Sequence, residues 1–282
     1  MKRACIMGHP VAHSRSPMLH GYWLRTLGVE GAYEHADVPP ENFEAFFRGL
    51  KRNGYAGGNI TIPHKEAAFR LVDRRERAAD AIGAVNTVWY EGDTLIGGNT
   101  DWYGIVASLD DIHPGWDASP GNAQKNVVVL GAGGSARASV FAFLERKFSV
   151  ALVNRTRERA EKLAAQFGPR VSVHEWREVP KLLADADVLI NTTSLGMAGK
   201  PLLEIDLTPL KKSAIVYDVV YVPLETALLK AAKAKGHRTV DGLSMLLYQA
   251  VNGFSHWFGV TPKVTAEQRA ILEDDIRAKS GG

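Results

Sequence analysis

The stretch NVVVLGAGGSARA at residues 126–138 decides the fold of the second half of the chain. Its first five residues are a nearly continuous apolar run, which predicts a strand buried on both faces of a parallel sheet. Glycines follow at once, and an Ala-, Val- and Phe-rich helix is expected to run to about Lys147. This order indicates a dinucleotide site, because a pyrophosphate must approach the backbone closely and the helix N-terminus offers free N–H groups. The alternative is a tight turn that binds nothing.

The loop supplies six candidate cofactor-binding residues, which are Gly131, Ala132, Gly133, Gly134, Ser135 and Ala136. About twenty residues further on, where an NAD site carries an acidic residue, stands Asn154-Arg155-Thr156. A carboxylate would repel a 2′-phosphate, whereas a guanidinium can clamp it and Thr156 can add a hydroxyl. The predicted cofactor is therefore NADP(H). Arg159 either reaches the same phosphate or is a solvated helix charge, and Arg157 is interpreted as a solvated charge paired with glutamates of its own helix.

Strands and helices alternate on both sides of this loop. Further strands are expected at 150–153, 171–173, 188–191 and 214–218, with an amphipathic helix at 157–167. Because these strands are nearly all apolar, they predict a Rossmann-like, doubly wound parallel sheet covered by helices on both faces. Two more helices are expected after residue 242 and from Ala266. Since the sheet is complete before them, they are expected to pack back on the first domain.

The first half of the chain reads as a separate α/β domain. Strands are expected at 4–7 and 33–38, helices at 17–27 and 41–51, and a hairpin at 84–90 and 94–97. The stretch 112–125 is rich in Pro and Gly and predicts a connection. The predicted division assigns residues 1–106 and 243–282 to a substrate-binding domain and residues 107–242 to an NADP-binding domain.

Composition narrows the class of partner. The chain has 282 residues, 45% of them hydrophobic, and a net charge of +3. This favours a globular protein with a small-molecule partner and argues against nucleic acid, which needs a basic stripe. Cys5 is the one cysteine, so neither a disulfide nor a zinc site is expected, and it is interpreted as a buried thiol. No signal peptide or membrane span is predicted, which favours the cytoplasm, and the chain is compatible with a monomer or a homodimer.

Polar residues gather in the first domain where strands are expected to end. They are Ser14, Ser16, Asn59, Thr61, Lys65, Asn86 and Asp101. Each has a simpler interpretation: Ser16 could cap a helix, Asn86 could lie in a turn, and Lys65 could be a surface lysine. Together they supply the hydroxyls, amides, amine and carboxylate that a polyhydroxylated ring acid would require.

The chain resembles the shikimate/quinate dehydrogenase family. Nine segments carry the resemblance, in order along the chain: GHPVAHSRSPMLH (8–20), GGNITIPHK (57–65), GAVNT (83–87), GGNTDWYG (97–104), GAGGSARA (131–138), NRT (154–156), NTTSLGM (191–197), YDVVY (217–221) and LYQAVNGFSHWFG (247–259). The resemblance implies the reversible reduction of 3-dehydroshikimate to shikimate by NADPH, in the biosynthesis of aromatic amino acids.

The resemblance also implies roles for particular residues. Ser14 and Ser16 would bind the substrate carboxylate, Thr61, Asn86 and Gln249 would bind the ring hydroxyls, and Tyr217 would line the same pocket. Asn59 would shape its loop. Leu195, Met197 and Val219 would frame the nicotinamide, and Thr192, Ser194 and Gly242 would complete the cofactor site.

Lys65 and Asp101 resemble the catalytic pair of the family. An ammonium held by a carboxylate can stabilise negative charge on a carbonyl oxygen and donate the proton that reduction requires. His64, beside Lys65, is expected to face solvent, and the charged run 74–77 is interpreted as a solvated surface turn.

Two alternatives remain open. One is a quinate or dual quinate/shikimate dehydrogenase. Ser16 and Arg155 argue against it, because quinate-active relatives tend to have a threonine at the position of Ser16 and an acidic residue at that of Arg155. The other is a non-catalytic, regulatory NADP-binding paralogue, since a fold does not guarantee an activity. Retention of Lys65, Asp101, Asn86 and Gln249 argues against it.

Overall fold

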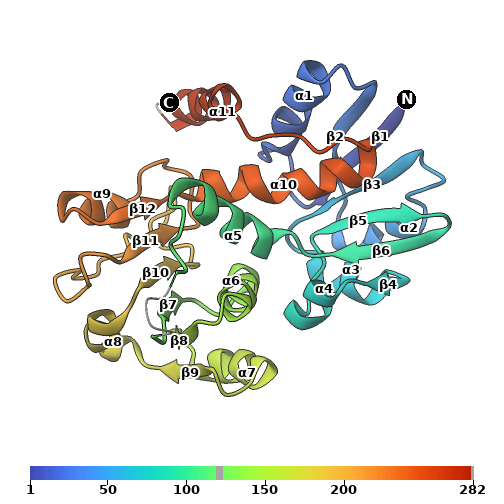
Figure 1. The fold of residues 1–282 in the computed structure, drawn as a ribbon. Coiled ribbons are helices and arrows are strands. Elements are labelled where there is room, and N and C mark those ends of the chain that lie inside the picture. Colours follow the sequence, from blue (N-terminus) through green and yellow to red (C-terminus); the bar gives the residue numbers. More distant parts are fainter. Residues whose placement is uncertain (119–122, 281–282) are drawn as a thin grey trace. The chain divides into compact units, whose positions relative to one another are not determined.

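The computed structural model describes residues 1–118 and 123–280, and it forms two compact units. The first comprises Met1–Thr100 with Leu247–Leu272, and the second Asp101–Leu246 with Glu273–Gly282. Each unit is built on its own sheet (Figure 1). Residues 119–122 of the connection predicted at 112–125 lie outside the described residues.

The sheet of the first unit has six strands in the described part of the chain. In spatial order they are β2 (Gly31–Asp37), β1 (Lys2–Gly8), β3 (Tyr55–Ile60), β5 (Thr87–Glu91), β6 (Thr94–Gly98) and β4 (Arg74–Arg75). β2, β1 and β3 are parallel, whereas β5 runs antiparallel to β3 and β6. The predicted hairpin is thus confirmed as β5 and β6.

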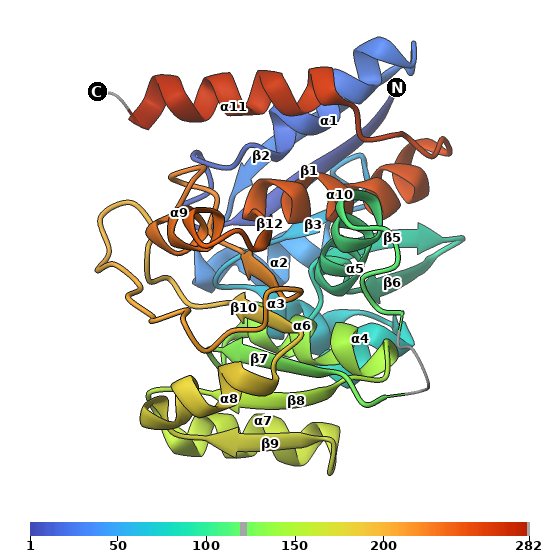
Figure 2. The same cartoon turned by 60° about the vertical axis from the view of Figure 1, so that its left-hand side comes forward.

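Helices cover both faces of this sheet. One face buries Cys5, Met7 and Val88 against α2 (Phe43–Arg48), α3 (Lys65–Leu71) and α4 (Arg77–Ile82). The other face meets α1 (Ser16–Thr26) and α10 (Gly242–Phe258), whose Trp257 Nε1 donates to Val88 O at 2.8 Å. The start of the last helix, α11 (Ala266–Ser280), contacts α1, where Gln268 Nε2 donates to Leu19 O (Figure 2). The prediction that the C-terminal helices pack back on the first domain is confirmed.

The second unit contains a six-stranded parallel sheet in the described residues. Its spatial order is β12 (Arg238–Val240), β11 (Ile215–Asp218), β10 (Val188–Asn191), β7 (Asn126–Leu130), β8 (Ser149–Val153) and β9 (Val171–His174). The strand order reverses at β7 and β10, so the carboxyl ends of these two strands form the switch point at which ligands bind in doubly wound sheets. The predicted Rossmann-like fold is confirmed.

Alternation along the strands explains why both faces of this sheet are covered. Val127 and Val129 join one core with α5 (Asp101–Ile112), α6 (Gly134–Glu145) and α7 (Arg157–Phe167). Val128 and Leu130 point the other way, into a core with α8 (Val179–Asp185) and α9 (Ala227–Ala234). Because successive strand residues face opposite sides, a continuous apolar run serves both cores.

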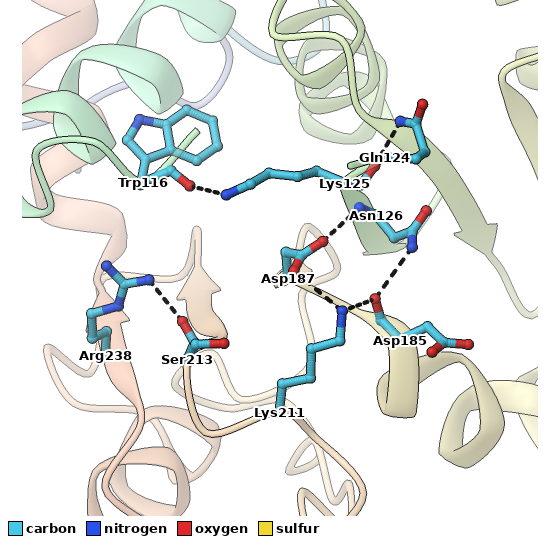
Figure 3. Close-up of polar contacts among 9 residues, drawn as sticks. All are labelled: Trp116, Gln124, Lys125, Asn126, Asp185, Asp187, Lys211, Ser213 and Arg238. Atoms are coloured by element: carbon cyan, nitrogen blue, oxygen red, sulfur yellow. Dashed lines mark hydrogen bonds and ion pairs between the residues drawn. The ribbon is translucent and has the colours of Figure 1, made fainter. Parts of the chain in front are cut away.

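A polar cluster ties together the amino ends of the strands in this unit (Figure 3). Asp187 accepts the backbone N–H of Asn126 at 2.9 Å and lies 3.2 Å from Lys211 Nζ. Asn126 and Lys211 also donate to Asp185 O, and Arg238 donates to Ser213 O. These bonds fix the starts of β7, β10 and β11 at the edge opposite the switch point.

Two local predictions were wrong. The helix expected at 41–51 is a 3₁₀ turn, η1 (Pro40–Asn42), followed by α2, which ends before Gly49, a poor helix former. The run at 74–77 is not a turn: Arg74 and Arg75 form β4, which pairs with β6, and Arg77 begins α4. Among the described residues, no helix is long and apolar enough to cross a membrane.

Candidate substrate and cofactor sites

The predicted carboxylate-binding serines lie at the start of α1. Ser14 Oγ donates to Ser16 Oγ at 3.3 Å and accepts the Ser16 backbone N–H, also at 3.3 Å. Ser16 is buried and is the first residue of the helix. The N-cap position is held by Arg15, whose side chain makes no capping hydrogen bond, so the interpretation of Ser16 as the helix cap is wrong. Two adjoining hydroxyls at a helix N-terminus suit an anion.

Thr61 and Lys65 follow β3 on a short loop. The loop is held to β1, because Thr61 N–H donates to Met7 O at 2.9 Å. Lys65 is the first residue of α3 and is half-buried. His64 is buried, with its ring stacked 4.1 Å from that of Phe43 and Nε2 2.7 Å from Val38 O. The expectation that His64 faces solvent was therefore wrong: its ring anchors the loop that carries Lys65.

A buried hydrogen-bond network runs through the first unit and fixes the amides of Asn59 and Asn86. Tyr33 OH donates to Asn59 Oδ1 at 2.6 Å, and Asn59 Nδ2 donates to Thr87 Oγ1 at 3.0 Å. Asn86 Oδ1 accepts from Thr87 Oγ1 at 2.9 Å and from the Thr100 backbone N–H at 2.8 Å. The amide of Asn86 therefore presents its oxygen to the protein, and its orientation follows from its partners.

Thr100 extends this network to the C-terminal helix. Its Oγ1 accepts from Asn86 Nδ2 at 3.2 Å and donates to Gln249 Oε1 at 3.1 Å. The structure thus brings Asn86 and Gln249, two of the predicted ring-binding residues, onto one threonine. Asp101 is the next residue of the chain, begins α5 and is 8% exposed. Thr87, Thr100 and Tyr33 were not singled out from the sequence, because their partners are distant along the chain.

The glycine loop of the second unit follows β7 directly. Gly131 has φ +110°, and a Cβ there would meet Thr192 Oγ1 at 2.7 Å, so both its conformation and its neighbour require glycine. Thr192 Oγ1 donates to Leu130 O at 2.5 Å, which joins the ends of β7 and β10 at the switch point. Ala136 is wholly buried in the core, where a small residue lets α6 lie close to the sheet.

The backbone conformation of Gly133 and Gly134, and the space around them, show whether this loop fits a dinucleotide. Neither has a positive φ, and a Cβ on either would meet nothing within 4 Å. Neither backbone conformation nor crowding therefore requires glycine at these two positions, whereas a pyrophosphate approaching the backbone does. Gly133 is the N-cap of α6 and has no side chain with which to bind the first N–H groups of the helix. The loop fits the predicted cofactor.

The residues after β8 form a cationic corner. Asn154 Nδ2 donates to Thr156 O at 2.8 Å, which shapes the turn around Arg155. Arg157 Nε lies 2.7 Å from Glu161 Oε1, so its interpretation as a helix charge paired on its own helix is confirmed. Arg155 and Arg159 are exposed and have no ion-pair partner among residues 1–118 and 123–280.

A second buried network orders the loops after β10 and β11. Asn191 Oδ1 accepts from the backbone N–H and the hydroxyl of Thr193, and its Nδ2 donates to Asp218 Oδ1 at 2.9 Å. Asp218 also accepts from Val220 N–H at 3.1 Å and Thr226 Oγ1 at 2.6 Å. Burial raises the pKa of Asp218 to about 6, although these donors oppose the shift. This network, too, was missed from the sequence.

The other predicted residues of the second unit lie on these loops or next to them. Ser194 and Met197 are exposed. A Cβ on Gly242 would meet Val219 O at 2.1 Å, so glycine there lets the start of α10 contact the loop that carries Val219. Tyr217 is fully buried in the core of its unit, and its hydroxyl lies 2.7 Å from Ser108 Oγ. Its role as a substrate ligand stays a prediction.

A doubly wound sheet with a glycine loop at its switch point, together with a mixed α/β unit that carries a buried polar network, defines a dinucleotide-binding α/β protein. Two family models match the chain: the shikimate dehydrogenase substrate binding domain at residues 6–88, and shikimate / quinate 5-dehydrogenase at residues 117–207. A shikimate dehydrogenase (NADP(+)) of Azorhizobium caulinodans is 55% identical over 280 residues, which is 99% of this chain and 98% of that protein.

Solved structures agree with this match. The shikimate 5-dehydrogenase of Thermus thermophilus, in complex with NADP(H) and shikimate, has a TM-score of 0.81 and 36% identity and covers 99% of both chains. The quinate dehydrogenase of Corynebacterium glutamicum, in complex with NAD, has a TM-score of 0.86 and 29% identity over 97% of this chain and 99% of its own. The chain belongs to the shikimate dehydrogenase family.

Proposed function

We propose that the chain catalyses the reversible, NADPH-dependent reduction of 3-dehydroshikimate to shikimate. The observation that carries the proposal is the 55% identity, over 99% of the chain, to a relative named shikimate dehydrogenase (NADP(+)). The pathway it would serve is the biosynthesis of chorismate and the aromatic amino acids.

The substrate would bind in the first unit. Ser14 and Ser16 would hold the carboxylate through their hydroxyls, while Thr61, Asn86 and Gln249 would bind the ring hydroxyls. Support comes from the contact between the two serine hydroxyls and from Thr100, which bonds to both Asn86 and Gln249. Buried amides whose orientation is already fixed lose little freedom when a ligand binds, which favours both affinity and discrimination among ring acids.

Lys65 and Asp101 would form the catalytic pair. In the direction of reduction, the ammonium of Lys65 stabilises the developing alkoxide and donates the proton, while the Asp101 carboxylate holds the ammonium in place. In the direction of oxidation, the neutral amine accepts the proton from the substrate hydroxyl. When bound, NADPH supplies the hydride that reduces the carbonyl carbon. The anchored His64 and the fixed Thr100, each next in sequence to one member of the pair, support precise placement of both side chains.

The cofactor would be held by the second unit. The backbone of residues 131–136 would bind the pyrophosphate, and Asn154, Arg155, Thr156 and Arg159 would bind the 2′-phosphate end. Thr192, Ser194, Met197, Val219 and Gly242 would complete the nicotinamide end. The openness of Gly133 and Gly134 and the unpaired charge of Arg155 among the described residues support this assignment.

We also propose the domain division 1–106 with 243–282, and 107–242, and a location in the cytoplasm, as a monomer or homodimer. The compact units change at Thr100 and Leu246, within a few residues of two of these boundaries, although residues 273–282 group with the second unit. The single cysteine is free and buried, as suits a reducing compartment.

Initial rates followed by nicotinamide absorbance test the proposal, with shikimate and quinate each paired with NADP and with NAD. Shikimate with NADP should exceed the other pairs by about tenfold or more in kcat/KM. Lys65→Ala should lower kcat by about 10²–10⁴-fold, the usual effect of a positioned acid or base. Lys51→Ala, which removes an exposed lysine paired with Asp93, is the matched control and should leave the rate unchanged.

Each other outcome has a defined meaning. If quinate reacts as fast as shikimate, the interpretation that Ser16 indicates a preference for shikimate is wrong. If NAD works as well as NADP, the interpretation that Arg155 selects NADP is wrong. Tight NADPH binding without turnover of either ring acid would favour a binding protein.

A further inference from the structure

A cavity of about 470 Å³ opens at the carboxyl ends of β8 and β9, within the second unit. Its wall includes Arg155 and Arg157 from the first turn after β8, and Glu175 and Trp176 after β9. Leu195, after β10, was predicted to frame the nicotinamide but lines this same cavity with Arg155. Small-molecule sites have volumes of roughly 300–1,000 Å³ and combine apolar walls with a few polar groups. This cavity has both properties.

Of the charged side chains named in the wall of the cavity, Arg157 and Glu175 have ion-pair partners and Arg155 has none within the described residues. Arg157 pairs with Glu161, and Glu175 pairs with Arg177 at 2.7 Å and lies 3.9 Å from Arg157. Arg155 has no such partner in the described part of the chain. The cavity therefore offers one uncompensated guanidinium, which favours a phosphate group at that point.

Trp176 supplies the aromatic surface of the cavity. The side chain of this large hydrophobic residue is 37% exposed, and no other aromatic ring among the described residues stacks on it. It is the first residue of the turn η3 (Trp176–Glu178), which is fixed by a capping box in which Glu178 Oε2 accepts the Glu175 N–H at 2.7 Å. A partly exposed indole on a turn fixed by these bonds is suited to stack on a planar ring.

We propose that Trp176 is the platform on which the adenine ring of NADP(H) stacks, while Arg155 binds the 2′-phosphate of the same half of the cofactor. The proposal rests on the NADP dependence proposed above. It assigns two separable contributions: Trp176 contributes affinity for the base, whatever the phosphorylation of the ribose, and Arg155 contributes the preference for the 2′-phosphate.

The test uses 2′,5′-ADP and 5′-ADP as probes, because both carry the adenine and neither carries a nicotinamide. Their dissociation constants are measured by calorimetry for the wild type, Trp176→Ala, Trp176→Phe and Arg155→Ala. Leu202→Ala, at a residue of the same unit that is 61% exposed, is the surface control. Thermal unfolding of each variant checks that it is folded.

Trp176→Ala should weaken both probes by about 5- to 100-fold, the range for loss of one stacked base, and should keep their ratio. Trp176→Phe should retain most of the affinity. Arg155→Ala should reduce the preference for 2′,5′-ADP over 5′-ADP, and Leu202→Ala should bind both probes like the wild type. Wild-type affinity in a folded Trp176→Ala variant, or a changed ratio of the two probes, would overturn the proposal. Initial rates of the wild type with shikimate and NADP test the proposed function separately.

Discussion

Thr100 shows how a residue that is not itself a proposed ligand can orient two side chains that are proposed to bind substrate. Its hydroxyl accepts from the Asn86 amide and donates to the Gln249 amide, so the two side chains are oriented together. The end of the amide that faces a ring hydroxyl decides whether that hydroxyl donates or accepts, and so which further bonds it can make. We therefore expect the specificity of the proposed site to depend on Thr100 as well as on Asn86 and Gln249.

Replacing this hydroxyl tests that dependence. Thr100→Val keeps the shape but removes the donor to Gln249, and we expect the KM for shikimate to rise about tenfold, on the scale of one hydrogen bond in a buried network. Thr100→Ser should restore the KM. Steady-state kinetics measure the effect, with urea unfolding in parallel. A loss of stability with an unchanged KM would mean that Thr100 is only structural.

At the level of elements, the amino and carboxyl ends of the strands in the second unit's sheet bear different groups of residues. The carboxyl ends of β7, β8 and β10 bear the glycine loop and the cationic corner. The amino ends bear the cluster of Asp187, Lys211 and Asn126, in which one carboxylate joins the starts of β7 and β10 to the segment before β11 (Figure 3). Changes at the two ends should therefore have separable consequences.

Asp187→Ala should lower the free energy of unfolding by about 1–3 kcal/mol, because it leaves the Asn126 N–H without its carboxylate partner. Lys211→Met should cost less than about 1 kcal/mol, since the lysine side chain is 38% exposed and such ion pairs contribute little. Urea unfolding measures both. The KM for NADP should stay unchanged in each variant, and an altered KM would contradict the expected separation of consequences.

The sequence predicted most accurately the helices and strands that are determined by the pattern of residues within a short stretch of chain. The strand at 188–191 and the helix at 157–167 were predicted with the bounds observed, because apolar spacing alone defines them. β4 could not be predicted, since two exposed arginines form a strand only through their backbone pairing with β6. The same reason hid the two buried networks: the chain brings Thr100 to Gln249 across 149 positions, and no local pattern encodes that contact.

At the scale of the whole molecule, two buried groups give stability opposite dependences on pH. His20 is enclosed by aromatic rings, its own ring lying 4.1 Å from that of Tyr33, and burial lowers its pKa to about 3. The unfolded chain therefore binds the proton first as pH falls below about 6.5, and stability is lost. The raised pKa of Asp218 acts the other way: the folded state holds the proton more tightly, so stability falls as pH rises from about 4 to 6.

His20→Phe should therefore remove about 2 kcal/mol of the stability lost between pH 7 and pH 5, given 1.36 kcal/mol per pKa unit. Asp218→Asn, which keeps the shape of the side chain, should instead increase stability at pH 7 relative to pH 5. Urea unfolding of the wild type and both variants at the two pH values measures these differences. If both variants changed the difference in unfolding free energy between pH 7 and pH 5 in the same direction, burial would not be what sets the two pKa values.

The glycines at 133 and 134 have a consequence for how this chain can evolve. Neither backbone conformation nor crowding excludes alanine there. At Gly134, inside α6, alanine restricts the unfolded chain and should stabilise the protein alone by roughly 0.4–1 kcal/mol, whereas at the N-cap Gly133 alanine caps the helix less well, which opposes this gain. A cost to cofactor binding would appear only with the pyrophosphate in place. Selection for stability and selection for cofactor affinity thus pull Gly134 in opposite directions, and a lineage released from catalysis would be expected to lose this glycine first.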